Sequence, residues 1–137
     1  MKALPLVGLF ALFISPLQAQ EQKDVAVTQL LSTTRTSSGQ PINLPQKNAQ
    51  IVASVYDVMP GTALPAHNHP YPCYGYVLAG ILRVTNIDTG QTNTYKRGSF
   101  FLEPVGQWQI GASIGREPLK LLVIDVVEQG QTNVVSP

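Results

Sequence analysis

The side chains best suited to chemistry lie close together in the middle of the chain. His67 and His69 are the only two histidines, and Cys73, the only cysteine, follows four residues later. If residues 67–69 are extended, both imidazoles point to the same face, because side chains alternate along a strand with a period of two. Two imidazoles and a nearby thiol bind transition metals well. The sequence therefore predicts a metal site in this segment.

The first 19 residues are typical of a secretory signal peptide. Lys2 provides a positive charge, residues 4–14 form an apolar stretch, and Ala19 is a small residue at the expected cleavage site. This apolar stretch is too short for a comfortable membrane span. We therefore expect a periplasmic or secreted protein that has no membrane partner after cleavage. In such an oxidising compartment a single cysteine cannot form a disulfide within the chain, so Cys73 needs burial or a metal ion.

Length and charge narrow the classes of partner. A chain of 137 residues provides one hydrophobic core and one domain. Without residues 1–19 and their single lysine, eight Lys and Arg residues balance eight Asp and Glu residues. A neutral chain without basic clusters is not expected to bind nucleic acid or an anionic membrane.

Short segments rich in apolar and β-branched residues, separated by Gly, Pro, Asn and Asp, predict an all-β fold. No segment has a convincing amphipathic helical pattern longer than three turns. The predicted strands are residues 25–34 (at a sheet edge), 50–58, 74–86, 92–95, 99–103, 108–112 and 119–127. The last of these is almost wholly apolar and is expected in the centre of a sheet. Many short strands at this spacing indicate a sandwich or a barrel.

Two motifs make the chain resemble the cupins, which are antiparallel β-barrels of the jelly-roll type. Residues 61–80 match the first cupin motif, G-x5-H-x-H-x3-4-E-x6-G, except that Cys73 replaces the glutamate. Residues 98–113 follow the second motif, G-x5-P-x-G-x2-H-x3-N, with Gln109 in place of the histidine and Ser113 in place of the asparagine. The resemblance extends from about residue 50 to residue 127.

The resemblance implies a simple domain layout. A signal peptide (1–19) and an N-terminal extension with an edge strand (20–49) precede one barrel (50–128), and a tail (129–137) follows it. Single-barrel cupins commonly pair, which implies a homodimer. The apolar residues 25–31 are expected to swap onto the sheet of a neighbouring copy.

The resemblance also implies that His67, His69, Cys73 and Gln109 hold one metal ion inside the barrel. A thiolate and an amide in place of a carboxylate and an imidazole make the site softer. This set favours copper, or zinc with two imidazoles, the thiolate and a water molecule. Iron and manganese are the alternatives, and they would need a carboxylate. Glu103 provides one if it faces inward, and it is otherwise a general base or a charge at the rim.

Each of these residues also has a purely structural interpretation. The two histidines can be ordinary strand residues, Cys73 a small buried hydrophobe, and Gln109 a hydrogen-bonding group in the pocket. Gly75 and Trp108 are expected at the pocket, where the missing side chain of Gly75 would leave space for a ligand.

Three function classes follow from these features. The first is an exported metal-binding cupin without turnover, and the second is a metalloenzyme of the oxygenase or isomerase type that acts on a small organic molecule. The third is a metal-free barrel that binds a small ligand. Because one fold serves many functions, the fold alone does not choose among them.

Overall fold

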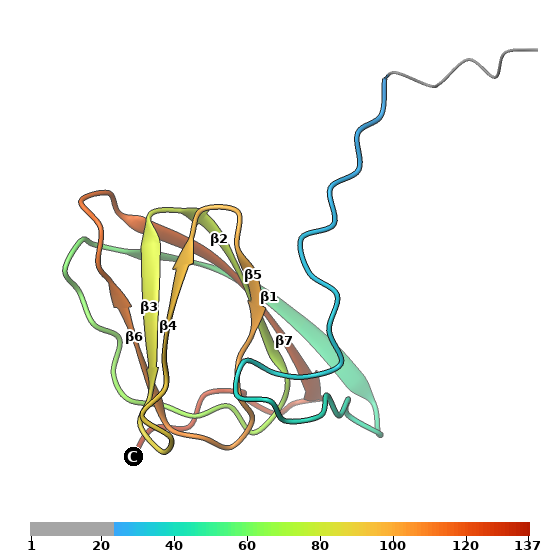
Figure 1. Ribbon diagram of the computed structural model, residues 1–137. Coiled ribbons are helices and arrows are strands. Elements are labelled where there is room, and N and C mark those ends of the chain that lie inside the picture. Colours follow the sequence, from blue (N-terminus) through green and yellow to red (C-terminus); the bar gives the residue numbers. More distant parts are fainter. Residues whose placement is uncertain (1–23) are drawn as a thin grey trace, which may run out of the picture.

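Alternation of buried and exposed side chains along short segments produces two antiparallel β-sheets in the computed structural model, which describes residues 24–137 (Figure 1). The strands are β1 (Ala49–Val58), β2 (Cys73–Ala79), β3 (Ile81–Asn86), β4 (Thr92–Lys96), β5 (Phe100–Leu102), β6 (Gln109–Ser113) and β7 (Leu119–Glu128). The expected signal peptide, residues 1–19, lies outside the described residues. Among the described residues, no helix is long and apolar enough to cross a membrane.

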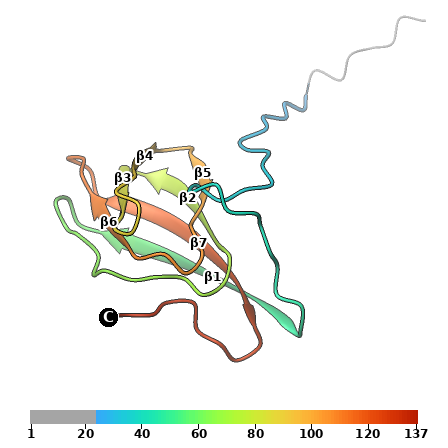
Figure 2. The ribbon, with the colours of Figure 1, turned by 60° about the horizontal axis from the view of Figure 1, so that its bottom comes forward.

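One sheet has four strands in the order β1-β7-β2-β5, and the other has three in the order β4-β3-β6. Their inner faces supply a shared core, in which the most deeply buried members are Val77, Leu119, Leu82 and Cys73. After β7 the chain turns back, and residues 129–137 run beside the loop that precedes β2 (Figure 2). The all-β, jelly-roll prediction is confirmed, and β7 is central in its sheet as expected.

The predicted strand over residues 74–86 is in fact two strands, which belong to different sheets. The break falls at Gly80, whose φ is +75°. A Cβ atom there would approach the backbone of Leu119 to 2.8 Å. Only glycine accepts this conformation and this close approach, so the motif glycine marks the corner between the two sheets.

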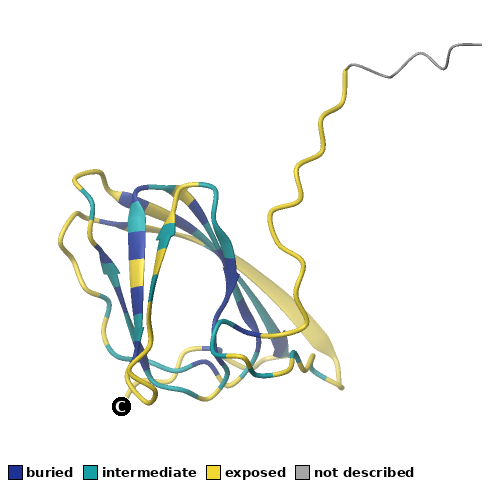
Figure 3. Ribbon diagram, viewed as in Figure 1, coloured by how far each residue is buried: buried dark blue, intermediate teal, exposed yellow. Residues whose placement is uncertain are grey.

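The predicted edge strand over residues 25–34 is also different in the structure. Residues 24–34, which we call the arm, pair with no strand of the described part of the chain and extend away from the barrel (Figure 1). The arm is exposed along its whole length, and so is most of β1 (Figure 3). Val27 is 90% exposed. A strand needs a partner for its main-chain groups, and among residues 24–137 the arm has one only at its end, where the Ile42 N–H donates to the Thr34 carbonyl at 3.1 Å.

Candidate metal centre

Three titratable side chains lie side by side, one just after β5, one on β2 and one on β7. Cys73 lies opposite Asp125 in the pairing of β2 with β7. On the other side of β2, the Glu103 main-chain N–H donates to the Cys73 carbonyl at 2.9 Å. All three side chains line the same cavity inside the barrel. The strand register therefore places a thiol between two carboxyl groups.

The two histidines reach this cavity from the loop between β1 and β2. The main chain of His67 pairs with that of Gln109 through two hydrogen bonds of 3.0 and 2.9 Å. The carbonyl of His69 accepts a hydrogen bond of 2.8 Å from Gly106. The His69 ring is buried, and its Nδ1 lies 2.6 Å from the carbonyl oxygen of Asn133. This contact leaves Nε2 of His69 free for a ligand.

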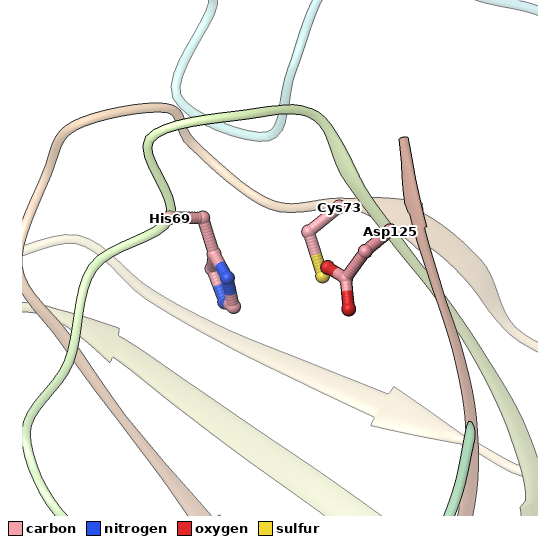
Figure 4. Close-up of side chains that lie close together, drawn as sticks. All are labelled: His69, Cys73 and Asp125. Atoms are coloured by element: carbon pink, nitrogen blue, oxygen red, sulfur yellow. The ribbon is translucent and has the colours of Figure 1, made fainter. Parts of the chain in front are cut away.

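His69, Cys73 and Asp125 come closest to forming a complete metal site. Each offers one ligand atom, and these atoms all lie within 4.8 Å of one another. Figure 4 shows the three side chains projecting into a common space, Cys73 from β2, Asp125 from β7 and His69 from the loop. His67 is outside this group, although its ring centre is 5.0 Å from that of His69. The sequence thus pointed to two of the three members.

Burial controls the protonation of the site. It raises the pKa of the Cys73 thiol, and the neighbouring Glu103 and Asp125 carboxylates raise it further. Burial likewise raises the pKa of Glu103 to about 7, against a hydrogen bond from Gln109 that lowers it. The pKa of His69 is lowered, mainly by burial. Without a cation, the thiol therefore keeps its proton and His69 is neutral near pH 7.

The donor set fits a divalent transition-metal ion. Imidazole, thiolate and carboxylate are all ligands that zinc accepts, and the two anions together balance the charge of a divalent ion inside the protein. Gln109 is a second indication of a bound ion or molecule, because its side chain is 1% exposed and its Oε1 has no hydrogen-bond partner among residues 24–137. Buried acceptors are normally satisfied, so this oxygen at the cavity wall is available to a bound ion or a bound molecule.

Beside the donor cluster the cavity is apolar. Its volume is about 180 Å³. The apolar wall consists of Leu64, Pro65, Leu82, Val84, Leu121, Val123 and Val134. An apolar cavity with a few convergent polar groups at one end is the usual form of a small-molecule site. The size allows a molecule of only a few heavy atoms.

The structure brings most of the residues predicted from the sequence to this cavity. His67, His69, Cys73, Gln109 and Glu103 all line it, and Glu103 faces inward.

Two predicted pocket residues do not line the cavity. The space beside Gly75 is filled by the ring of Phe101, which stacks on Tyr95 with ring centres 4.0 Å apart. Trp108 precedes Gln109, and because side chains alternate along the chain it points away when Gln109 points inward. The expectation that Gly75 and Trp108 form the pocket was therefore wrong.

Sequence reasoning missed Asp125 and Asn133. Asp125 received no role, although it occupies an inward position two residues after Val123, in the apolar run of β7 from residue 121 to residue 127. A charged residue at such a position indicates a partner inside the barrel. Asn133 lies in the tail and carried no signal in the sequence.

A comparison with known families agrees with the fold. The family described as "Cupin domain" matches residues 54–125, which is more than half of the chain. No curated protein matches the chain.

Solved structures of the same fold include several enzymes. The polyketide cyclase RemF from Streptomyces resistomycificus is similar with a TM-score of 0.53 at 23% identity, over 64% of this chain and 61% of that one. An oxalate decarboxylase from Lactobacillus farciminis, in a formate complex, is similar with a TM-score of 0.54 at 23% identity, over 63% of this chain and 26% of that one. Oxalate decarboxylase from Bacillus subtilis, which has Mn(II) centres, is similar with a TM-score of 0.53 at 28% identity, over 63% of this chain and 23% of that one. The chain thus spans less than two thirds of the cyclase and about a quarter of each decarboxylase.

Proposed function

Because this chain belongs to the cupin family, we propose that its barrel binds one transition-metal ion through His69, Cys73 and Asp125. His67 is the fourth donor in this proposal, and Gln109 lies beside the ion as a weak oxygen ligand. The observation that carries the proposal is the group of three ligand atoms within 4.8 Å of one another. A nitrogen and a sulfur from buried side chains and an oxygen from a half-buried one, on three separate parts of the chain, converge there.

The chemistry of these donors favours zinc or copper. A thiolate with two imidazoles suits both ions. The carboxylate of Asp125 shifts the preference toward zinc, which readily combines nitrogen, sulfur and oxygen ligands in a tetrahedral site. The thiolate also makes the site softer than an all-imidazole and carboxylate site of the kind that suits iron or manganese.

Titration with Co²⁺ and Cu²⁺, followed by absorption spectroscopy, tests the proposal. We expect one equivalent of metal to produce a thiolate-to-metal charge-transfer band. The band should disappear in Cys73→Ser, which keeps the size of the side chain but removes the thiolate. Asp57→Asn, on the exposed part of β1, serves as a control that should leave the band unchanged. A wild-type protein that binds neither ion would contradict the proposal.

A second candidate function is a metalloenzyme that acts on a small organic molecule. The apolar cavity of about 180 Å³ next to the donor cluster supports it, because a pure metal carrier needs no such space. The Mn(II) centres of the Bacillus subtilis oxalate decarboxylase make manganese a reasonable ion to test in this case. Turnover of small carboxylic acids by the manganese-loaded or iron-loaded protein, absent from His69→Ala, would favour this candidate. A metal-free barrel that binds a small ligand is favoured instead if every ion binds weakly.

We further propose that the protein is periplasmic or secreted and forms a homodimer. The signal-like residues 1–19 support export. The exposed apolar arm and the exposed apolar side chains of β1, such as Ile51 at 70%, support pairing of the arm with the sheet of a second copy. Light scattering of the mature protein tests this pairing. A monomer at all concentrations would contradict it.

A further inference from the structure

One residue of the C-terminal tail is buried among exposed neighbours. Asn133 is 5% exposed, whereas residues 129–132 and 134–137 are all exposed. Burial of a polar side chain from an otherwise exposed segment is unfavourable unless its hydrogen bonds are made. The hydrogen-bond partners of Asn133 therefore indicate why its side chain is buried.

Asn133 contacts two members of the candidate metal site at once. Its main-chain carbonyl lies 2.6 Å from Nδ1 of His69. Its side-chain Nδ2 donates to Oδ1 of Asp125 at 2.6 Å. A second contact of Nδ2, with the carbonyl of Pro72, is 3.4 Å long. The His69 and Asp125 side chains come from different parts of the chain, and Asn133 is a hydrogen-bonding partner that they share.

The orientation of the Asn133 amide follows from its other partner. The main-chain N–H of Tyr71 donates to Oδ1 of Asn133 at 2.7 Å. Because an N–H group must meet an acceptor, the oxygen of the amide faces Tyr71 and the NH₂ group faces Asp125. The side chain thus uses both its donor end and its acceptor end.

The tail is held in this place by main-chain pairing. Asn68 and Val135 exchange two hydrogen bonds, each of 3.0 Å. This bridge fixes the tail next to the histidine-bearing loop, as Figure 2 shows for the segment that leads to the C-terminus. Asn133 is therefore positioned by the same loop that carries His69.

These contacts determine the tautomer of the His69 ring and which oxygen of Asp125 is available to a metal ion. A carbonyl oxygen only accepts, so Nδ1 of His69 must carry the proton and Nε2 presents its lone pair to the cavity. One oxygen of Asp125 is occupied by the Asn133 amide, which leaves the other for a metal ion. Second partners of this kind fix the tautomer and the orientation of metal ligands.

We infer that Asn133 is a positioning residue of the metal centre, which selects the Nδ1-protonated tautomer of His69 and aims one oxygen of Asp125 at the ion. This inference rests on the proposed function, because it concerns the geometry of the same site. The tail is then part of the metal centre, although it lies outside the family match at residues 54–125.

The first test compares Zn²⁺ affinity and Co²⁺ spectra of the full-length wild type and Asn133→Ala. We expect Asn133→Ala to bind zinc about 10-fold more weakly, as is usual for loss of such a partner. Its thiolate-to-cobalt band should remain, with a shifted ligand-field band. The matched control is Asn86→Ala, since Asn86 is equally buried at 5% but its side chain bonds to Gln107 and to the turn after β3. Equal affinity and an equal spectrum in wild type and Asn133→Ala would overturn the inference.

The second test asks whether Asn133 acts through Asp125. In an Asp125→Asn background, Asn133→Ala should weaken zinc binding by much less than it does in the wild type. The same further loss in both backgrounds would mean that the Asn133 side chain acts independently of Asp125, which would overturn that part of the inference.

The third test needs no metal and no variant. Nitrogen-15 NMR of the imidazole in the metal-free wild type should show His69 with its proton on Nδ1, and a proton on Nε2 alone would overturn the inference. Failure of the proposed function and failure of the positioning role would give different results. If the wild type binds no metal, that result contradicts both the proposed function and the positioning role. If the wild type binds metal but the Asn133 variants are unaltered, only the positioning role is lost.

Discussion

The two sides of the candidate metal centre are held in different ways. Cys73 and Asp125 lie side by side in the four-stranded sheet, and Glu103, directly after β5, continues the row, so that main-chain hydrogen bonds fix the spacing of all three. The two histidines lie on a loop that is held by isolated bridges to residues 105, 109 and 112 and to the tail, and by the Leu64 N–H, which donates to the Gly111 carbonyl. Main-chain pairing therefore fixes the positions of the thiol and the carboxyl groups, whereas the positions of the two imidazoles depend on a few individual hydrogen bonds.

The largest expected loss of zinc affinity follows substitution of a histidine. His69 belongs to the close group of ligand atoms and His67 does not. Since loss of an outer partner already weakens a site about 10- to 100-fold, His69→Ala should lower zinc affinity by more than about 100-fold. His67→Ala should lower it by about 10-fold. Competition with a chromophoric chelator measures both affinities, and equal losses would show that the two imidazoles are equivalent.

In the four-stranded sheet, Asp125→Asn should weaken zinc binding by about 10- to 100-fold, because it removes a charge but keeps the shape of the side chain. The matched control is Asp57→Asn. Asp57 is an exposed residue of β1 that lies 3.6 Å from Lys120, and its replacement should leave affinity unchanged. If both variants bind zinc like the wild type, Asp125 contributes no carboxylate to the site.

Glu103 allows a test of the electrostatics of the row without metal. Burial raises its pKa from 4.5 to about 7, so the folded protein holds a proton there that the unfolded chain has released. Its contribution to stability is therefore fully present below pH 4.5 and is lost as the pH rises through 7. A shift of this size corresponds to about 3 kcal/mol at most.

Glu103→Gln should remove this pH dependence, because the amide is neutral at every pH. We expect the metal-free variant to be more stable than the wild type at pH 8, by up to about 3 kcal/mol. Urea unfolding in the presence of a chelator, at pH 5 and at pH 8, measures the difference. A difference between the two proteins that does not change with pH would show that Glu103 has an ordinary pKa.

The smallest effect on metal binding is expected at Gly75. A Cβ atom there would collide with the ring of Phe101. Gly75→Ala should destabilise the fold by about 1 to 3 kcal/mol through overpacking, and the metal stoichiometry should remain one per chain. Thermal unfolding and metal analysis of the same sample check both parts. Loss of metal with unchanged stability would mean that Gly75 belongs to the site after all.

Much of this molecule could be predicted from the sequence, because local patterns determine it. Alternating apolar residues and turn residues indicated the strands, and the spacing of His67, His69 and Cys73 indicated the site. Gly80 was recognised as a motif position, but the sequence did not reveal that it divides one apolar run between two sheets. That division depends on how closely Leu119 packs against the glycine.

The rest of the site could not be predicted, because it depends on contacts between distant segments. Asp125 reaches the cluster through the register of β7 against β2, 52 positions from Cys73 in sequence. Asn133 reaches His69 because the tail turns back on the barrel. The space beside Gly75 was misjudged because Phe101, which fills it, lies on another strand. A spacing motif describes residues on one segment of the chain and carries no information about contacts between distant segments.

X-ray absorption of the zinc-loaded protein identifies the atoms bound to the ion, and so shows whether Cys73 is a ligand. We expect one sulfur at about 2.3 Å together with nitrogen and oxygen ligands at about 2.0 to 2.2 Å. The sulfur shell should be absent from Cys73→Ser. A wild-type spectrum with no sulfur shell would contradict a metal centre built from the loop histidines and the β2–β7 row.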